Sequence, residues 1–150
     1  METINRDIVA AMLISKDNKL FVAMKNPKRL GVYSDCWHIP GGGINKNEEK
    51  IQALIREIKE ETKIDISKYK IELVDDEGVG ESERLLDHKQ VHCKMRFFVY
   101  KVSIDDKNAN EIIVNLDEEL EKYEWVEFSE LKKYKLTPPS VILFKKFGYL

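Results

Sequence analysis

Residues 42–64, GGINKNEEKIQALIREIKEETKI, form the most informative segment of this 150-residue chain. From residue 51 onward, apolar side chains recur at the i, i+3, i+4, i+7 spacing of one buried helical face. They are Ile51, Leu54, Ile55 and Ile58. This spacing predicts an amphipathic helix from Glu48 to about Thr62. The glycines before it predict a turn through which the chain enters that helix.

Three glutamates lie along one edge of the predicted helix: Glu57, Glu60 and Glu61. Like charges three or four positions apart on a helix repel by about 0.2 to 0.5 kcal/mol per pair. Clustered oxygen ligands without histidine or cysteine are what a hard cation such as Mg²⁺ selects. A solvated acidic face is the alternative, and geometry alone leaves both interpretations open. The run Gly41–Gly43 favours a metal-diphosphate site, because glycine lets the backbone approach a ligand closely.

The rest of the chain predicts a mixed sheet with helices packed on it. Strands are expected at six places, which are 8–14, 20–24, 71–79, 91–104, 111–114 and 123–128. The charged segment 80–90 is expected to be a loop. Ser129 is expected to cap a short helix, and Pro138 to open a terminal helix that runs to Phe147. This order of elements is typical of an α/β domain.

Composition predicts one ordinary globular domain over residues 1–150. The chain has 25 basic and 27 acidic residues, a net charge of −2, so no overall field attracts a nucleic-acid polymer or an anionic membrane. Cys36 and Cys93 are too far apart to suggest a zinc knuckle or a disulfide framework. The N-terminus lacks the apolar core of a signal peptide. We therefore expect a cytoplasmic protein without a membrane or nucleic-acid partner.

Residues 42–64 closely resemble the Nudix box, G-x5-E-x7-R-E-U-x-E-E-x-G-U, in which U is aliphatic. Eight of its nine specified positions match, namely Gly42, Glu48, Arg56, Glu57, Ile58, Glu60, Glu61 and Ile64. The departure is Lys63, which stands where the family has glycine. A left-handed residue is expected there, just past the helix end, where a side chain costs about 1 kcal/mol. The resemblance implies the family's fold, an α/β/α sandwich with a mixed sheet between helices.

The resemblance also implies a role for each residue of the site. Glu57 and Glu61 would be the principal ligands of Mg²⁺, or of Mn²⁺ in its place, completed by Glu60 and the Gly41 carbonyl. Glu60 is the first choice for positioning the attacking water, and Glu119, from a later acidic stretch, is the alternative. Arg56 would orient a glutamate of the cluster. Independently of the resemblance, Glu48 lies near the positive end of the helix dipole and is expected to cap the start of the helix.

The function that this resemblance implies is metal-dependent hydrolysis of the diphosphate bond in a nucleoside-diphosphate derivative. Nucleoside triphosphates and nucleotide sugars are favoured as substrates, because the chain has no added domain to enlarge the site. The alternative is a Nudix-fold domain that binds nucleotides or regulates without catalysis, although all three glutamates are retained. Homodimerisation stays open. The histidines have no zinc-protease spacing and receive no role.

Overall fold

The sheet is organised around its first strand, β1 (Glu2–Ser15). β1 pairs in parallel with β6 (Lys89–Ile104) over its whole length. Its other edge pairs antiparallel with β4 (Gly41–Gly43) and, at its C-terminal end, with β2 (Lys19–Lys25). The sheet is therefore mixed, as the sequence predicts.

The computed structural model describes residues 1–28, 33 and 35–150. The strand order is β3-β2-β1-β6-β5, with β4 added on β1 and β7 on β2. Among the described residues, no helix is both long enough and apolar enough to cross a membrane. The other elements, in chain order, are β3 (Trp37–His38), α1 (Lys50–Thr62), β5 (Ile71–Leu86), a 3₁₀ helix (Ala109–Glu111), β7 (Leu120–Glu127), a second 3₁₀ helix (Phe128–Lys133) and α2 (Pro138–Lys146).

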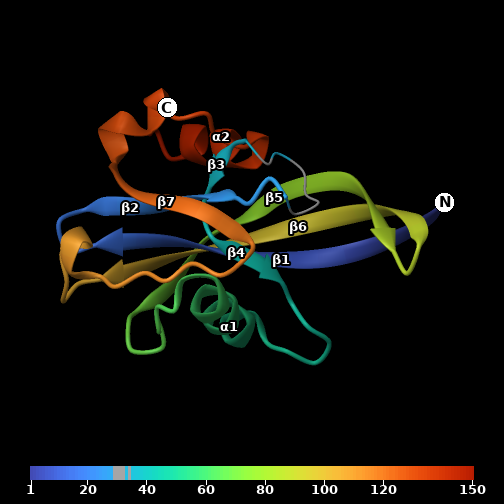
Figure 1. The fold of residues 1–150 in the computed structure, drawn as a ribbon, viewed down its shortest axis with the longest axis horizontal. Coiled ribbons are helices and arrows are strands. Elements are labelled where there is room, and N and C mark those ends of the chain that lie inside the picture. The colour runs from blue at the N-terminus through green and yellow to red at the C-terminus, as the bar shows by residue number, and fades with distance from the viewer. Residues whose placement is uncertain (29–32, 34) are drawn as a thin grey trace.

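The two α-helices cover opposite faces of the sheet, α1 below it and α2 above it in Figure 1. α1 contributes Leu54 and Ile58 to the hydrophobic core on its side. α2 contributes Leu143 and Phe144 to the core on the other side. Residues 11–15 of β1 are all buried, because successive side chains of a strand point to opposite faces and both faces are covered. The expected α/β/α sandwich is confirmed.

Helix α1 begins two residues later than predicted, and its buried face is rotated. Glu49 precedes its first turn and donates its backbone N–H to the Gln52 side chain at 3.1 Å. Ile51, predicted to be buried, is 38% exposed, whereas Ala53 is fully buried. The rotation turns the Glu61 side of the helix toward the sheet, so that this face is not purely apolar.

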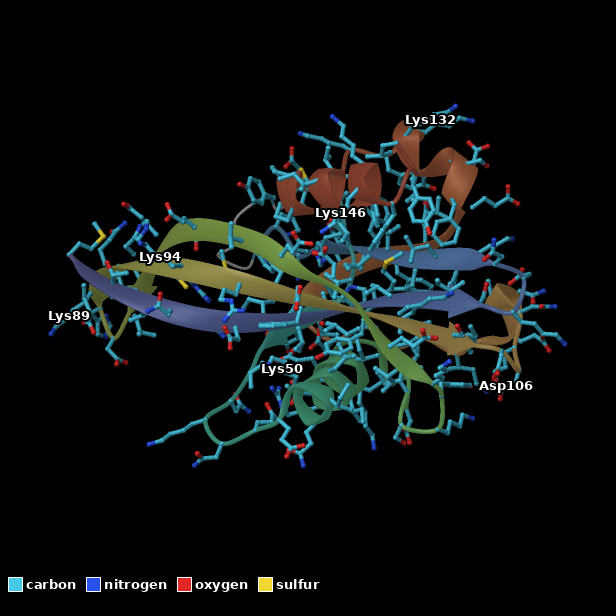
Figure 2. All side chains as sticks on the ribbon, turned by 180° about the vertical axis from the view of Figure 1, so that it is seen from behind. Lys50, Lys89, Lys94, Asp106, Lys132 and Lys146 are labelled. Atoms are coloured by element: carbon cyan, nitrogen blue, oxygen red, sulfur yellow. The ribbon has the colours of Figure 1, made fainter. Side chains whose placement is uncertain are left out.

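The predicted loop over 80–90 is wrong, because β5 and β6 continue through it as a long hairpin. The turn is made by Asp87 and His88, which both have positive φ, at 49° and 66°. Together with the first residues of β1, this hairpin extends past the helices as a projecting arm, marked by Lys89 and Lys94 in Figure 2. Most of the outer part of β5 is exposed and polar, so it lacks the apolar alternation that predicts a strand.

The predicted strand at 111–114 is also wrong. The chain forms the 3₁₀ helix Ala109–Glu111 and then continues without regular structure. The Glu111 side chain accepts the Asn108 backbone N–H at 2.9 Å, which closes this turn. Ile112 and Val114 still pack on the α1 side of the core. Their burial explains the apolar pattern without a strand.

Near the C-terminus the predictions agree with the structure more closely. α2 begins at Pro138, as expected, and ends at Lys146, one residue before the predicted end. The short helix predicted around Ser129 is the 3₁₀ helix Phe128–Lys133, which starts before that serine. Ser129 therefore lies inside this helix and does not cap it.

Candidate active site

Helix α1 presents its three glutamates to three different environments. Glu61 is 3% exposed and faces the sheet. The Glu57 side chain is 14% exposed, and that of Glu60 is 56% exposed. The helix therefore carries a gradient of burial across the acidic edge that the sequence predicts, from an enclosed carboxylate to a solvated one.

Glu61 is a buried acid without a basic partner among the described residues. Its Oε1 accepts the backbone N–H of Gly41 at 2.9 Å, which ties α1 to strand β4. Burial raises the pKa of Glu61 well above its ordinary value, and the nearby charge of Glu57 raises it further. A nearby cation would therefore be needed to stabilise the ionised carboxylate in this buried position.

The expected glycine turn is in fact strand β4, which is paired with β1. A Cβ atom on Gly42 would lie 2.5 Å from Oε2 of Glu57, too close for any real contact. The absence of a side chain at this position lets the Glu57 carboxylate lie directly against the backbone. Burial also raises the pKa of Glu57, in opposition to the nearby Arg56, which lowers it.

Arg56 binds several acids at once. Its Nε and Nη2 donate to the two carboxylate oxygens of Glu48 at 2.8 and 2.9 Å, and Nη2 also donates to the Gly43 carbonyl at 3.0 Å. Its Nη1 contacts Glu57 at 2.9 Å and Glu60 at 3.3 Å. These are the contacts that an orienting residue would make, and the orienting role itself stays a prediction.

Glu48 does not cap helix α1. It receives both guanidinium hydrogen bonds from Arg56, and its Oε1 also accepts the backbone N–H of Asn45 at 3.0 Å. These bonds stabilise the carboxylate and lower the pKa of Glu48 to about 2. Its position in the sequence suggested a dipole effect, whereas its partners show a link between the loop before α1 and Arg56.

A later segment of the chain adds two more acids to the site. The backbone N–H of Asp117 donates to the Glu61 carbonyl at 3.2 Å, which brings this segment along the end of α1. The charge of Glu119 raises the pKa of both Glu57 and Glu61, and that of Asp117 raises the pKa of Glu61. Glu119, the predicted alternative base, thus lies in the field of the cluster. Asp117 received no role from the sequence, although it belongs to the same acidic stretch.

The carboxylates are not gathered around one point. Within the described ranges, no three acidic, histidine or cysteine side chains stand in an arrangement that would hold a metal ion as they are. Arg56 binds Glu57 and Glu60, while Glu61 is turned toward Gly41. Coordination by all three glutamates would therefore require their side chains to turn away from these partners.

Aromatic and basic residues line the chain before β4. Trp37 packs edge-on against Tyr134, with 5.5 Å between ring centroids, so it serves the core rather than an open stacking surface. The Nδ1 of His38 donates to the Ile39 carbonyl at 2.8 Å, but its buried Nε2 has no partner in the described part of the chain. The sequence predicts a solvated basic loop from Lys25, Lys28 and Arg29. Lys25 is instead the last residue of β2, whereas Lys28 is exposed in a turn as expected. Arg29 lies outside the described residues.

Comparisons of the chain with known proteins point to one family. A family model for the NUDIX domain matches residues 4–147. The RNA pyrophosphohydrolase of Hydrogenovibrio crunogenus is 31% identical over 96% of this chain and 83% of its own length. The nucleoside triphosphatase NudI of Klebsiella pneumoniae is 26% identical over 97% of this chain and 98% of its own length.

Among solved structures, the MutT protein from Methanosarcina mazei Go1 has a TM-score of 0.68 and 20% identity. The match covers 99% of this chain and 96% of that one, and it shows a shared fold. The family model and the full-length relatives carry the assignment further. The chain belongs to the Nudix family and is a Nudix-type pyrophosphohydrolase.

Proposed function

We propose that this protein hydrolyses the diphosphate bond of a nucleoside triphosphate or related derivative, with Mg²⁺ as its cofactor and residues 1–150 as one catalytic domain. The observation that carries the proposal is Glu61, an acid buried without a basic partner among the described residues. Glu57 and Glu119 add negative charge beside it. Because this arrangement lowers the free energy of unfolding, a purely structural role does not account for it.

The donor set fits a hard divalent cation, which Nudix hydrolases generally use. Every side-chain donor of the cluster is a carboxylate oxygen, the kind of ligand that Mg²⁺ prefers over nitrogen or sulfur. Glu57 and Glu61 are the ligands we propose, with Glu60 and the Gly41 carbonyl completing the set. Mn²⁺ prefers similar donors and is an alternative.

The proposed role of each site residue follows from its surroundings. When bound, the cation would neutralise phosphate charge and make a water more acidic. Arg56 holds Glu57 and Glu60 from one side and the Gly43 carbonyl from the other, so it would fix the carboxylates relative to β4. Glu60, the most exposed of the three, would accept the proton of the attacking water. Glu119 is the alternative acceptor.

Two substrate classes have support from the relatives. The nucleoside triphosphatase NudI aligns over nearly the whole of both chains and favours a free nucleoside triphosphate. The RNA pyrophosphohydrolase of Hydrogenovibrio crunogenus is more similar in sequence and favours RNA, a polymer that the net charge of −2 argues against. A nucleotide sugar stays a third substrate for testing. A domain that binds nucleotides without catalysis is the alternative function.

The test is product release from a panel of free triphosphates, triphosphorylated RNA, nucleotide sugars and ADP-ribose, with and without Mg²⁺. We expect metal-dependent turnover that falls about 100-fold or more in Glu57→Gln and in Glu61→Gln. Glu72→Gln, which removes an exposed acid of β5, serves as the matched control and should change little. If both site variants keep full activity, the ligand assignment is wrong. No turnover on any substrate would support the non-catalytic alternative.

A further inference from the structure

The projecting arm has two open edges, one on each side of its three strands. In the arm, β6 lies between β1 and β5, and the N-terminus lies at its end (Figure 1). No described residue pairs with the outer side of β5, or with residues 2–6 of β1 on the side away from β6. Open edges present unpaired backbone N–H and C=O groups, which pair readily with a strand of another chain.

The charge of β5 protects its edge against a second copy of itself. This strand carries six acidic residues and one basic residue, Arg84. Antiparallel pairing of two copies centred on Ser82 would set Glu81 opposite Glu83 of the partner subunit. Like charges directly opposite each other destabilise a strand pair. The edge of β5 is therefore unsuited to self-association.

The edge of β1 is open for two residues whose backbone groups point outward. The Asp7 carbonyl accepts the Ile44 N–H across this edge at 3.1 Å, and Ala11 also donates its N–H across it. Odd-numbered residues of β1 therefore direct their backbone groups to this edge, and Thr3 and Asn5 do so in its open part. A symmetric antiparallel pair uses these groups in two registers. Thr3 faces Thr3 of the partner subunit in one, and Asn5 of the partner subunit in the other.

The side chains of this edge favour the second register. Centred on Ile4, it sets Glu2 opposite Arg6 of the partner subunit, twice by symmetry. Glu2 is exposed and Arg6 is half-buried, and neither forms an ion pair or side-chain hydrogen bond with a described residue. Nη2 of Arg6 lies 1.9 Å from where a Cβ atom of Gly43 would be, so the guanidinium leans toward this edge. Opposite charges facing each other stabilise an antiparallel pair. The first register sets Glu2 opposite Ile4 and leaves both charges unpaired.

We infer that this protein forms a two-fold homodimer in which residues 2–6 of β1 pair antiparallel with the same residues of a second copy. The two arms then join into one continuous sheet, with the Ile4 side chains facing each other at its centre. A pair of short strands is a small interface, so we expect a dissociation constant on the order of 1 to 100 µM. The dimer does not depend on the proposed function, because no residue of the glutamate cluster takes part in it.

Sedimentation velocity over a concentration series tests for this dimer. Glu2→Arg and Arg6→Glu should each weaken dimerisation about tenfold or more, because each sets like charges opposite each other twice. The double variant, Glu2→Arg with Arg6→Glu, should recover most of the affinity, since it restores the pairs in reverse. Glu83→Arg makes the same charge change at an exposed position of β5 and should dimerise like wild type. The inference is wrong if wild type stays monomeric up to about 0.5 mM, or if the double variant is as weak as the single ones.

Oxidative cross-linking tests the register. Cys93 of β6 is aligned with Ile4, so the variant combines Ile4→Cys with Cys93→Ala. It should form a covalent dimer, because facing residues between two hydrogen-bonded pairs have Cα atoms about 4.5 Å apart, within the range of a disulfide. Val79→Cys with Cys93→Ala is the control, because Val79 is 73% exposed on β5, and it should stay monomeric. If Ile4→Cys does not cross-link, or if only Val79→Cys does, this interface is wrong.

Discussion

Helices α1 and α2 cover the two faces of one sheet, and each lies near a buried acid. On the α2 side, Asp75 of β5 has a side chain that is 7% exposed and is paired with Lys146, which also binds Glu77 at 2.8 Å. On the α1 side, Glu61 is buried to a similar degree, and from the described part of the chain its carboxylate receives only a backbone N–H. Figure 2 shows Lys146 beside the sheet on the α2 side and Lys50 on the other. Asp75 thus has its cation built into the chain, whereas under the proposed function a metal ion would take that place beside Glu61.

The largest expected effect is on the paired acid. Lys146→Met removes the ammonium group from Asp75 and leaves a buried carboxylate unpaired, which should lower Tm by about 4 to 8 °C. Lys145→Met, the neighbouring position on the same helix, should change Tm by less than about 2 °C. Thermal unfolding measures both, and kcat should be unchanged in both. If the two variants unfold at the same temperature, the ion pair does not support the fold.

The opposite sign is expected for the unpaired acid. Because the pKa of Glu61 is raised above its ordinary value of 4.5, the folded protein binds its proton more tightly than the unfolded chain does. Its contribution to stability is therefore fullest below pH 4.5 and is lost as pH rises through the raised pKa. Glu61→Gln removes this loss, so it should stabilise the metal-free protein at pH 8 by at least about 1 kcal/mol, or about 2 to 4 °C.

Chemical unfolding with a chelator present, at pH 4 and at pH 8, measures this difference. The advantage of Glu61→Gln should be small at pH 4 and grow toward pH 8, while its activity falls. If Glu61→Gln is less stable than wild type at pH 8, the protein itself stabilises the ionised Glu61 carboxylate, and no metal is needed for that.

The smallest effect concerns how the helices end. After α2 the left-handed position is Gly148, with φ of 78°. After α1 it is Lys63, with φ of 65°, and its Nζ donates to the Glu60 carbonyl at 2.8 Å. The left-handed residue expected at position 63 is thus confirmed, and the hydrogen bond offsets part of its strain. Lys63→Gly should therefore raise Tm by no more than about 2 °C.

Lys63→Ala is the matched variant, because it keeps the strained Cβ and loses the hydrogen bond. It should melt below wild type, as should Gly148→Ala, where the strained φ is the cost and no atom crowds the new Cβ. If Lys63→Gly melts well below wild type, the lysine bond outweighs the strain.

The sequence predicts the fold class and the site segment because both depend on local patterns. The spacing of Leu54 and Ile58 identifies α1, and Pro138 identifies α2. The burial of Glu61 could not be predicted, because it depends on how α1 is rotated about its axis against β4. Hydrophobicity instead predicted that Ile51 would face the core, where it is exposed. Asp117 joins the cluster through the path of a segment without regular structure, for which no local pattern exists.

The arm was missed for a different reason. Its hairpin turn at Asp87 and His88 lacks the glycine or asparagine that is most common at positive φ. The strand before the turn is mostly charged and exposed from Glu81 to Arg84, so it lacks an apolar alternation. Strand pairing there is set by continuation of the buried part of β6. Strand pairing that depends on residues far away in the sequence cannot be detected from the hydrophobic pattern of a short segment.

The parallel pairing of β1 with β6 also sets the order of events during synthesis. Each residue of β1 pairs with one made about 90 positions later, from Glu2 opposite Val91 to Ser15 opposite Ile104. The hairpin to β2 can form as soon as both strands have emerged, but the other edge of β1 stays open until most of the chain exists. Contacts of such long separation slow folding and leave apolar strands exposed to other chains. The strand at the centre of the sheet is thus the first to be made and among the last to be enclosed.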